Sequence, residues 1–177
     1  MLCNIMNKSS GLALDAMGNG DLCQYRLHND INQRFVIETV DDKTGDVIIH
    51  CGSRTSGFVL GIHTNSSNKG DGYSVGRVAL LQPLCLEQQW KVVSSNTDGF
   101  VMILSAARPS LALDLRQCSH EDSAAVELYP CHGGENQLWR LTPTQSVLFP
   151  PMTPEEMQVE QLLQPKHSHS SRLVMLF

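Results

Sequence analysis

Two segments of the chain repeat the same set of side chains able to hydrogen-bond a polar ligand. Each set holds one carboxylate, one tyrosine ring and two side-chain amides, in the same order. A carboxylate accepts hydrogen bonds, an amide donates and accepts them, and an aromatic ring packs against an apolar face. Such a set suits a sugar, which presents adjacent hydroxyls and a face of C–H groups. The two sets are Asp15, Tyr25, Asn32 and Gln33, and Asp114, Tyr129, Asn136 and Gln137.

The sequence does not favour catalysis or metal binding. It contains no nucleophile elbow and no phosphate-binding loop, and its histidines are not tied to a serine or cysteine by any signature. A glycosidase would use two carboxylates flanking a cleft, whereas Asp15 and Asp114 lie in different segments. No two cysteines form a C-x-x-C pair, and His167 and His169 are typical of a solvated tail. We therefore expect no catalytic residue, no metal and no cofactor.

The two sets belong to a larger pattern that occurs three times. Residues 10–15 resemble residues 110–114, and residues 56–61 form a more distant copy. The glutamine at position 33 recurs at positions 88 and 137. The repeat is about 50 residues long, which is within the range of known repeat architectures.

Each copy reads as strands joined by turns. Its apolar runs are short, rich in Val, Ile and Leu, and separated by Gly, Asn, Asp and Ser. Four strands per copy give twelve in all, and closing them into a barrel would leave no exposed sheet edge. Strands are expected at 47–51, 58–63, 77–82 and 89–94 in the second copy, and at 100–106, 111–116, 126–131 and 137–142 in the third.

The motifs that end the three copies resemble those of a known family. Residues 88–90 and 137–139 read Gln-x-Trp, residues 33–35 read Gln-Arg-Phe, and Leu-Ala-Leu-Asp precedes two of these motifs. Together they resemble the ricin B-chain type β-trefoil lectins over residues 1–142. The resemblance implies an all-β fold, a β-trefoil of three four-stranded repeats at about 1–46, 47–99 and 100–142, with a tail at 143–177.

The resemblance also implies which repeated residues are structural. Phe35, Trp90 and Trp139 are expected in the barrel core rather than as platforms for a sugar. The three motif glutamines are expected to hydrogen-bond backbone groups of neighbouring loops, because a buried amide needs partners.

In the third repeat, the strand that carries Tyr129 is similar to the family strand whose aromatic residue stacks on the sugar. Asp114 would accept hydrogen bonds from two hydroxyls, Asn136 would contact one of them, and Gln137 would brace Asp114. Glu127 stands where the family often has an amide side chain. The carboxylate can still accept hydrogen bonds from a sugar, but it cannot donate one as an amide does. The resemblance implies a site for galactose or N-acetylgalactosamine.

The first repeat has the same arrangement, with Asp15, Tyr25, Asn32 and Gln33 in the matching positions. A second sugar site is therefore expected there.

The second repeat is expected not to bind. It has Gly61 in place of the aspartate, Leu80 in place of the tyrosine and Glu87 in place of the asparagine. A structural alternative is that each aspartate only fixes a turn and each tyrosine only covers the barrel edge. The loss of all three residue types in one repeat argues against this alternative, since folding would require them there as well.

Residues 143–177 differ in composition from the repeats. Five prolines interrupt any strand pattern, and residues 153–156 read as the start of a short helix that ends before Pro165. The apolar residues 173–177 could dock on the barrel or on another copy of the chain, which makes a homo-oligomer possible.

The overall charge argues against two classes of partner. The formal net charge is -5, and the Lys and Arg residues are scattered, so no positively charged patch is expected that would bind nucleic acid or an anionic membrane. No apolar run is long enough to insert into a membrane. No signal peptide is visible in the sequence. The family often has a disulfide to a cysteine just before the aspartate, and alanine occupies that position here. We therefore expect a cytoplasmic protein unless another export route exists.

Two functions remain from different classes. The first is a lectin that binds galactose-containing glycans. The alternative is a β-trefoil that recognises a protein without a sugar, such as a protease inhibitor or the targeting subunit of a toxin, because a fold does not determine a function.

Overall fold

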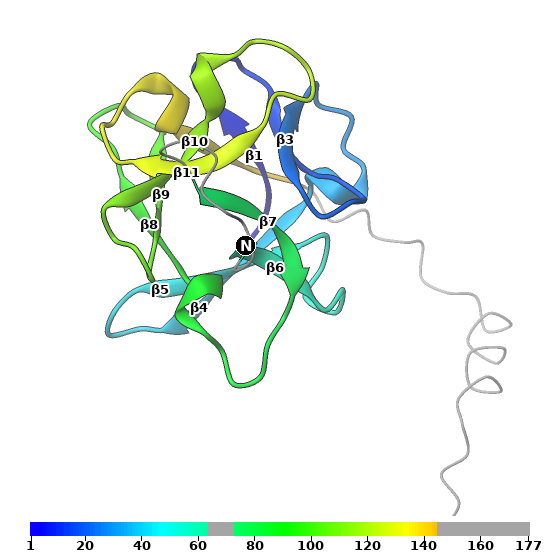
Figure 1. The fold of residues 1–177 in the computed structure, drawn as a ribbon, viewed down its shortest axis with the longest axis vertical. Coiled ribbons are helices and arrows are strands. Elements are labelled where there is room, and N and C mark those ends of the chain that lie inside the picture. The colour runs from blue at the N-terminus through cyan, green and yellow to red at the C-terminus, as the bar shows by residue number, and fades with distance from the viewer. Residues whose placement is uncertain (64–72, 145–177) are drawn as a thin grey trace, which may run out of the picture. The chain divides into compact units, whose positions relative to one another are not determined.

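The computed structural model describes residues 1–63 and 73–144, which form twelve strands and four short 3-10 helices in three groups (Figure 1). The first group is β1 (Leu2–Asn7), β2 (Ala13–Ala16), β3 (Leu22–Tyr25), η1 (Ile31–Gln33) and β4 (Phe35–Asp41). The second is β5 (Asp46–Cys51), β6 (Phe58–Ile62), β7 (Tyr73–Ala79), η2 (Leu86–Gln88) and β8 (Trp90–Ser94). The third is β9 (Val101–Ser105), β10 (Leu111–Leu115), η3 (Arg116–Cys118), β11 (Val126–Pro130), η4 (Glu135–Gln137) and β12 (Trp139–Pro143).

Six strands close into a barrel. β1 pairs with β4, β4 with β5, β5 with β8, β8 with β9, β9 with β12, and β12 with β1, always antiparallel. Each repeat contributes its first and fourth strands. Because the ring is closed, it leaves no barrel edge open for pairing with another chain. The expected all-β trefoil is thereby confirmed.

The second and third strands of each repeat form a hairpin attached to the barrel. The hairpins are β2–β3, β6–β7 and β10–β11. One residue pair joins each hairpin to the first strand of its repeat at the same place, and these pairs are Met6 with Ala13, His50 with Val59, and Leu104 with Ala112. Ala13, Val59 and Ala112 are therefore equivalent positions, from which the three repeats can be compared.

The three hairpins also contact one another. Glu127 faces Ser74, and isolated bridges join Asp21 to Gly76 and Cys23 to Ala125. Each repeat thus touches both of the others through its hairpin, and a loop in one repeat helps to position a strand in the next.

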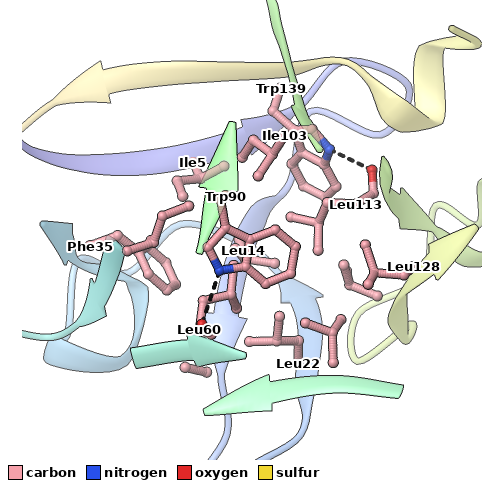
Figure 2. Close-up of a cluster of buried hydrophobic side chains, with 14 of the residues drawn as sticks. Ile5, Leu14, Leu22, Phe35, Leu60, Trp90, Ile103, Leu113, Leu128 and Trp139 are labelled. Carbon is pink, nitrogen blue, oxygen red and sulfur yellow. Dashed lines mark hydrogen bonds between the residues drawn. The ribbon is translucent and has the colours of Figure 1, made fainter. Parts of the chain in front are cut away.

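Large aromatic residues fill the core, as expected from the sequence (Figure 2). Phe35, Trp90 and Trp139 are fully buried. The Trp90 indole Nε1 donates to the Leu60 carbonyl, and the Trp139 Nε1 donates to the Leu113 carbonyl, both over 3.0 Å. Each indole therefore ties the fourth strand of its repeat to the second strand while it fills the barrel.

The motif glutamines hydrogen-bond the backbone, which confirms their expected role. In the second repeat, Gln88 Oε1 accepts from the Leu81 N–H over 3.0 Å and Gln88 Nε2 donates to the Ala79 carbonyl over 2.6 Å. These bonds close the loop between β7 and β8. Each glutamine ends a 3-10 helix, an element too short to produce a periodic sequence signal.

Most strands of the second and third repeats lie within two residues of the expected bounds. The exception is the strand expected at 77–82, because β7 spans Tyr73–Ala79. The chain leaves the sheet after Ala79, since the Leu81 N–H bonds the Gln88 side chain and not a neighbouring strand. The expected short helix and the apolar end of the tail lie outside the described residues.

Neither a disulfide nor a membrane helix is found in the part of the chain that the structure describes. All six cysteines fall within it and are free thiols, of which Cys3, Cys23 and Cys51 are buried. Burial raises the pKa of Cys51 to about 12, so this thiol stays protonated. No described helix has the length and apolar character needed to cross a membrane.

Candidate functional site

Asp15 lies at the centre of a hydrogen-bonded cluster in the first repeat. Its strand, β2, is buried throughout, and Asp15 itself is 5% exposed. Asn32 Nδ2 donates to Asp15 Oδ1 over 2.7 Å, and Gln33 Nε2 donates to Asp15 Oδ2 over 3.2 Å. The two amides are consecutive residues of η1, and this single turn aims both at one carboxylate.

Gln33 is held in turn by the loop that precedes η1. Its Oε1 accepts from the backbone N–H groups of His28 and Asn29, over 2.9 and 3.3 Å. Its Nε2 also donates to the Arg26 carbonyl over 3.1 Å. Both ends of the buried amide are satisfied, so the loop from β3 to η1 is fixed around the carboxylate.

The third repeat contains the same cluster around Asp114, which lies on β10 and is 3% exposed. Asn136 Nδ2 donates to Asp114 Oδ1 over 2.9 Å, and Gln137 Nε2 donates to Asp114 Oδ2 over 2.8 Å. Gln137 Oε1 accepts from the backbone of the loop after β11, as Gln33 does after β3.

The two tyrosines hold equivalent places beside these carboxylates. Tyr25 pairs with Ala13 across the first hairpin, and Tyr129 pairs with Ala112 across the third. Each tyrosine thus lies opposite the residue two positions before the aspartate, on the same face of the hairpin. Both are half-buried, so each ring keeps accessible surface for a ligand.

A histidine that the sequence analysis missed completes each cluster. His28 Nε2 lies 3.3 Å from Asp15 Oδ2, and His132 Nε2 lies 3.4 Å from Asp114 Oδ2. Each imidazole is also edge-on to the neighbouring tyrosine, with ring centroids 6.0 and 6.1 Å apart. The signal was present in the sequence, because both histidines stand three residues after the tyrosine and five before the glutamine.

The orientation of the two imidazoles follows from their other nitrogen. The backbone N–H two residues further on donates to Nδ1 of His28 over 3.2 Å and to Nδ1 of His132 over 3.1 Å. In the neutral ring the proton then lies on Nε2, which faces the carboxylate. The first-repeat cluster is defined as Asp15, Tyr25, His28, Asn32 and Gln33, and the third-repeat cluster as Asp114, Tyr129, His132, Asn136 and Gln137.

The residue opposite the aspartate differs between the two clusters. Asp114 pairs with Glu127, whereas Asp15 pairs with Cys23. Glu127 Oε1 lies 3.8 Å from Arg116 Nε, and its side chain is 19% exposed. Burial raises the pKa of Glu127, Arg116 lowers it in part, and the nearby Asp114 charge raises it further.

Burial also dominates the ionisation of Asp114. It raises the pKa of this carboxyl above its ordinary value, and the hydrogen bonds from Gln137 and Asn136 and the charge of His132 offset only part of the effect. The carboxylate is therefore a desolvated acceptor, which binds a donor more strongly than an acceptor in water does.

The second repeat holds no comparable cluster. The hairpin register places Val78 opposite Val59, so Val78 and not Leu80 occupies the tyrosine position. Counting back from Gln88 gave Leu80 because the segment between β7 and Gln88 is two residues longer than its counterparts. A Cβ atom added at Gly61 would lie 2.5 Å from Val78 Cγ2, so an aspartate does not fit there without a shift.

No group of three or more His, Cys, Asp or Glu side chains within residues 1–63 and 73–144 could hold a metal ion. What the two clusters offer is one carboxylate, two amides, an imidazole and a tyrosine each. These groups can bind several hydroxyls at once and pack against one apolar face.

Comparison with known proteins agrees with this architecture. Residues 86–150 match the family model described as ricin-type beta-trefoil lectin domain-like. Over these residues the chain is similar to ricin-type β-trefoil lectin domains. No curated protein sequence matches the chain.

Several solved structures have a similar fold. The designed threefold-symmetric protein ThreeFoil is 28% identical with a TM-score of 0.70, and the match covers 81% of this chain and 99% of ThreeFoil. An exo-beta-1,3-galactanase from Clostridium thermocellum is 25% identical with a TM-score of 0.68, over 81% of this chain and 30% of the enzyme. The ricin B-like lectin of Macrolepiota procera, solved with lactose, is 20% identical with a TM-score of 0.66, over 81% of this chain and 96% of the lectin.

Proposed function

We propose that the protein is a lectin that binds galactose or N-acetylgalactosamine type sugars through the first-repeat and third-repeat clusters. The observation that carries this proposal is the duplication of five side chains at equivalent positions of two repeats. The second repeat keeps the structural residues Gln88 and Trp90. At the equivalent positions it has neither the aspartate, nor the tyrosine, nor the asparagine of the other two repeats. A purely structural role for those positions would apply to all three repeats.

A sugar would enter each cluster at the aspartate. In the first-repeat cluster, Asn32 and Gln33 already donate to the two Asp15 oxygens, and a carboxylate offers about four lone-pair sites. The His28 contact is the longest of the three, at 3.3 Å, which is beyond the usual range of about 2.7–3.2 Å. We infer that a sugar hydroxyl replaces or shares this contact, while a second hydroxyl bonds the remaining lone pair.

The tyrosine ring would supply the apolar part of binding. Tyr25 and Tyr129 lie on the same hairpin face as the carboxylates, so a pyranose held by its hydroxyls can place its C–H face on the ring. The similarity to a lectin solved with lactose and to an exo-beta-1,3-galactanase supports the galactose assignment.

The proposal assigns binding and no catalysis to the two clusters. Asp114 and Glu127 project from paired positions of one hairpin, on the same side of a bound sugar. Hydrolysis of a glycosidic bond needs two carboxyl groups on either side of that bond. The match covers 30% of the galactanase, so the activity of the whole enzyme is not assigned to this chain.

One observation favours the alternative function. Asp15 and Asp114 are only 5% and 3% exposed and are hydrogen-bonded, as residues with a structural role would be. In that case the loops would recognise a protein partner without sugar. The exposed Ile31, Leu81 and Leu86 would then offer apolar contact surface.

Calorimetric titration with galactose, lactose and N-acetylgalactosamine, with glucose as the control sugar, tests the proposal. We expect two weak sites with dissociation constants on the order of a millimolar. Tyr25→Ala and Tyr129→Ala should each remove one site and leave the fold unchanged, because neither phenol takes part in the buried hydrogen-bond network. The matched control is Leu81→Ala, an exposed residue of the corresponding second-repeat loop, which should keep both sites.

Absence of any saturable sugar binding at concentrations of about tens of millimolar would reject the lectin proposal in favour of protein recognition.

A further inference from the structure

The two clusters differ mainly in the residue that pairs with the aspartate across the hairpin. Residues directly opposite in an antiparallel pair have Cβ atoms about 4.5–5.5 Å apart, with side chains on one face. Glu127 therefore shares the face of Asp114, and Cys23 shares that of Asp15. The third-repeat cluster has a second carboxylate where the first-repeat cluster has a thiol.

No described residue donates a hydrogen bond to the Glu127 carboxylate. Among the described residues its only polar contact is with Arg116, over 3.8 Å, which is too long for a hydrogen bond. Its side chain is 19% exposed, so it has lost most of its hydration. A carboxylate that is removed from water and accepts no hydrogen bond raises the free energy of the protein. A ligand that donates a hydrogen bond to it offsets this desolvation free energy.

Arg116 is a loose counter-ion for this carboxylate. Its side chain is 48% exposed, and it belongs to η3, where Gln117 and Cys118 have positive φ angles of 55° and 51°. Asp114 and Glu127 contribute two negative charges at this place, and Arg116 offers one positive charge at a distance. The third-repeat cluster therefore favours a ligand with a positive charge.

The first-repeat cluster has no equivalent acceptor. Cys23 is 3% exposed, and burial together with the nearby Asp15 charge raises its pKa to about 11. Its thiol stays neutral and is a weak hydrogen-bond acceptor. The other carboxylates near this cluster are not paired with Asp15. Asp30 lies beside His28 Nδ1, on the side of the ring away from Asp15. Asp122 forms an ion pair with Arg26, and Asp21 accepts a hydrogen bond from Asn19.

We propose that the third-repeat cluster selects amino sugars with a free, protonated amino group over the parent neutral sugar, and that Glu127 determines this selectivity. The first-repeat cluster, with Cys23 at the same place, does not distinguish the two. This inference rests on the proposed lectin function and adds the ligand class of one of its two sites.

The experiment measures galactosamine and galactose binding at each cluster separately, at pH 7 and low salt. The Tyr25→Ala variant reports the third-repeat cluster and the Tyr129→Ala variant the first-repeat cluster. In the Tyr25→Ala background we expect galactosamine to bind about tenfold more tightly than galactose, because a charge-assisted hydrogen bond is about twice as strong as a neutral one. In the Tyr129→Ala background the two affinities should be equal within about twofold, since the residue paired with Asp15 is Cys23 and not a carboxylate.

Glu127→Gln in the Tyr25→Ala background should reduce the ratio of galactosamine to galactose affinity from about tenfold to within about twofold, because the amide keeps the size of the side chain and loses its charge. Glu127→Cys introduces the residue of the first-repeat cluster and should have the same effect. Raising the salt concentration should reduce the galactosamine preference and leave galactose affinity unchanged, since only the first depends on a charge pair near the surface.

Two outcomes reject the inference in distinguishable ways. If galactose saturates the third-repeat cluster but galactosamine is not preferred, or if Glu127→Gln keeps the preference, the selectivity is wrong and the lectin function stands. If neither sugar saturates either cluster, both the selectivity and the lectin function are rejected.

Discussion

The second repeat and the third repeat share a scaffold and differ in the chemistry that it carries. Both bury a tryptophan whose indole donates to the second strand, and both close a loop with a motif glutamine. Only the third repeat places a carboxylate, a tyrosine, a histidine and an asparagine around that glutamine. We therefore expect that the candidate site can be disrupted without loss of the fold.

The scaffold gives the largest expected effect, and it should be alike in the two repeats. Trp90→Ala and Trp139→Ala each remove a fully buried indole and its hydrogen bond. Each should lower the free energy of unfolding by about 3–5 kcal/mol. Urea denaturation followed by circular dichroism measures both. A much smaller loss of unfolding free energy in one variant would show that the two tryptophans do not contribute equally to stability.

The sequence was sufficient for this shared scaffold. The spacing of Gln-x-Trp motifs and short apolar runs predicted the three repeats, nearly all strand positions in the second and third of them, and the burial of Phe35, Trp90 and Trp139. Such features are encoded by local periodicity and by apolar residues, which depend little on distant contacts.

Gly61 gives the next largest effect, at the position that holds an aspartate in the first and third repeats. Gly61→Ala should cost about 1–3 kcal/mol, because its Cβ would lie 2.5 Å from Val78 Cγ2 in a packed hairpin. It should create no sugar site. Thermal unfolding measures the cost, and the double variant Gly61→Ala with Val78→Ala should recover most of it. Failure of the second substitution to rescue stability would show that another contact excludes a side chain at position 61.

Position 78 also shows where reading the sequence was insufficient. Leu80 was assigned to the tyrosine position by counting from Gln88, but β7 ends earlier and the connection is two residues longer. Loop lengths shift such a count, and only strand pairing reveals the equivalent residue. His28 and His132 were missed for a different reason, since a lone histidine in a loop has no periodicity and its role depends on a carboxylate on another strand.

The smallest expected effect is the pH dependence of the third-repeat cluster. Burial raises the pKa of Asp114, so protonation should weaken galactose binding at a pH above that of an ordinary aspartate, about 4. Because the folded pKa is above the unfolded value, ionised Asp114 costs stability at neutral pH, and that cost disappears as the pH falls through the folded pKa. The loss of binding should therefore not reflect unfolding caused by this group.

Titration of the Tyr25→Ala variant with galactose from pH 7 to pH 4, with circular dichroism at each step, measures this dependence. Glu127 and His132 also lie near Asp114, and Arg116 lies near Glu127. The Glu127→Gln variant separates the contribution of the second carboxylate. Affinity that stays constant down to pH 4 would show that the charge of Asp114 is not used in binding.

The most direct test of the central claim is a chemical-shift titration of the isotope-labelled protein with galactose. We expect saturable shifts of backbone amides around the first-repeat and third-repeat clusters, including His28 and His132, with none around Gly61, Val78 and Glu87. Shifts in the second repeat alone, or no saturable shift in any repeat, would contradict the assignment of sugar binding to the two clusters.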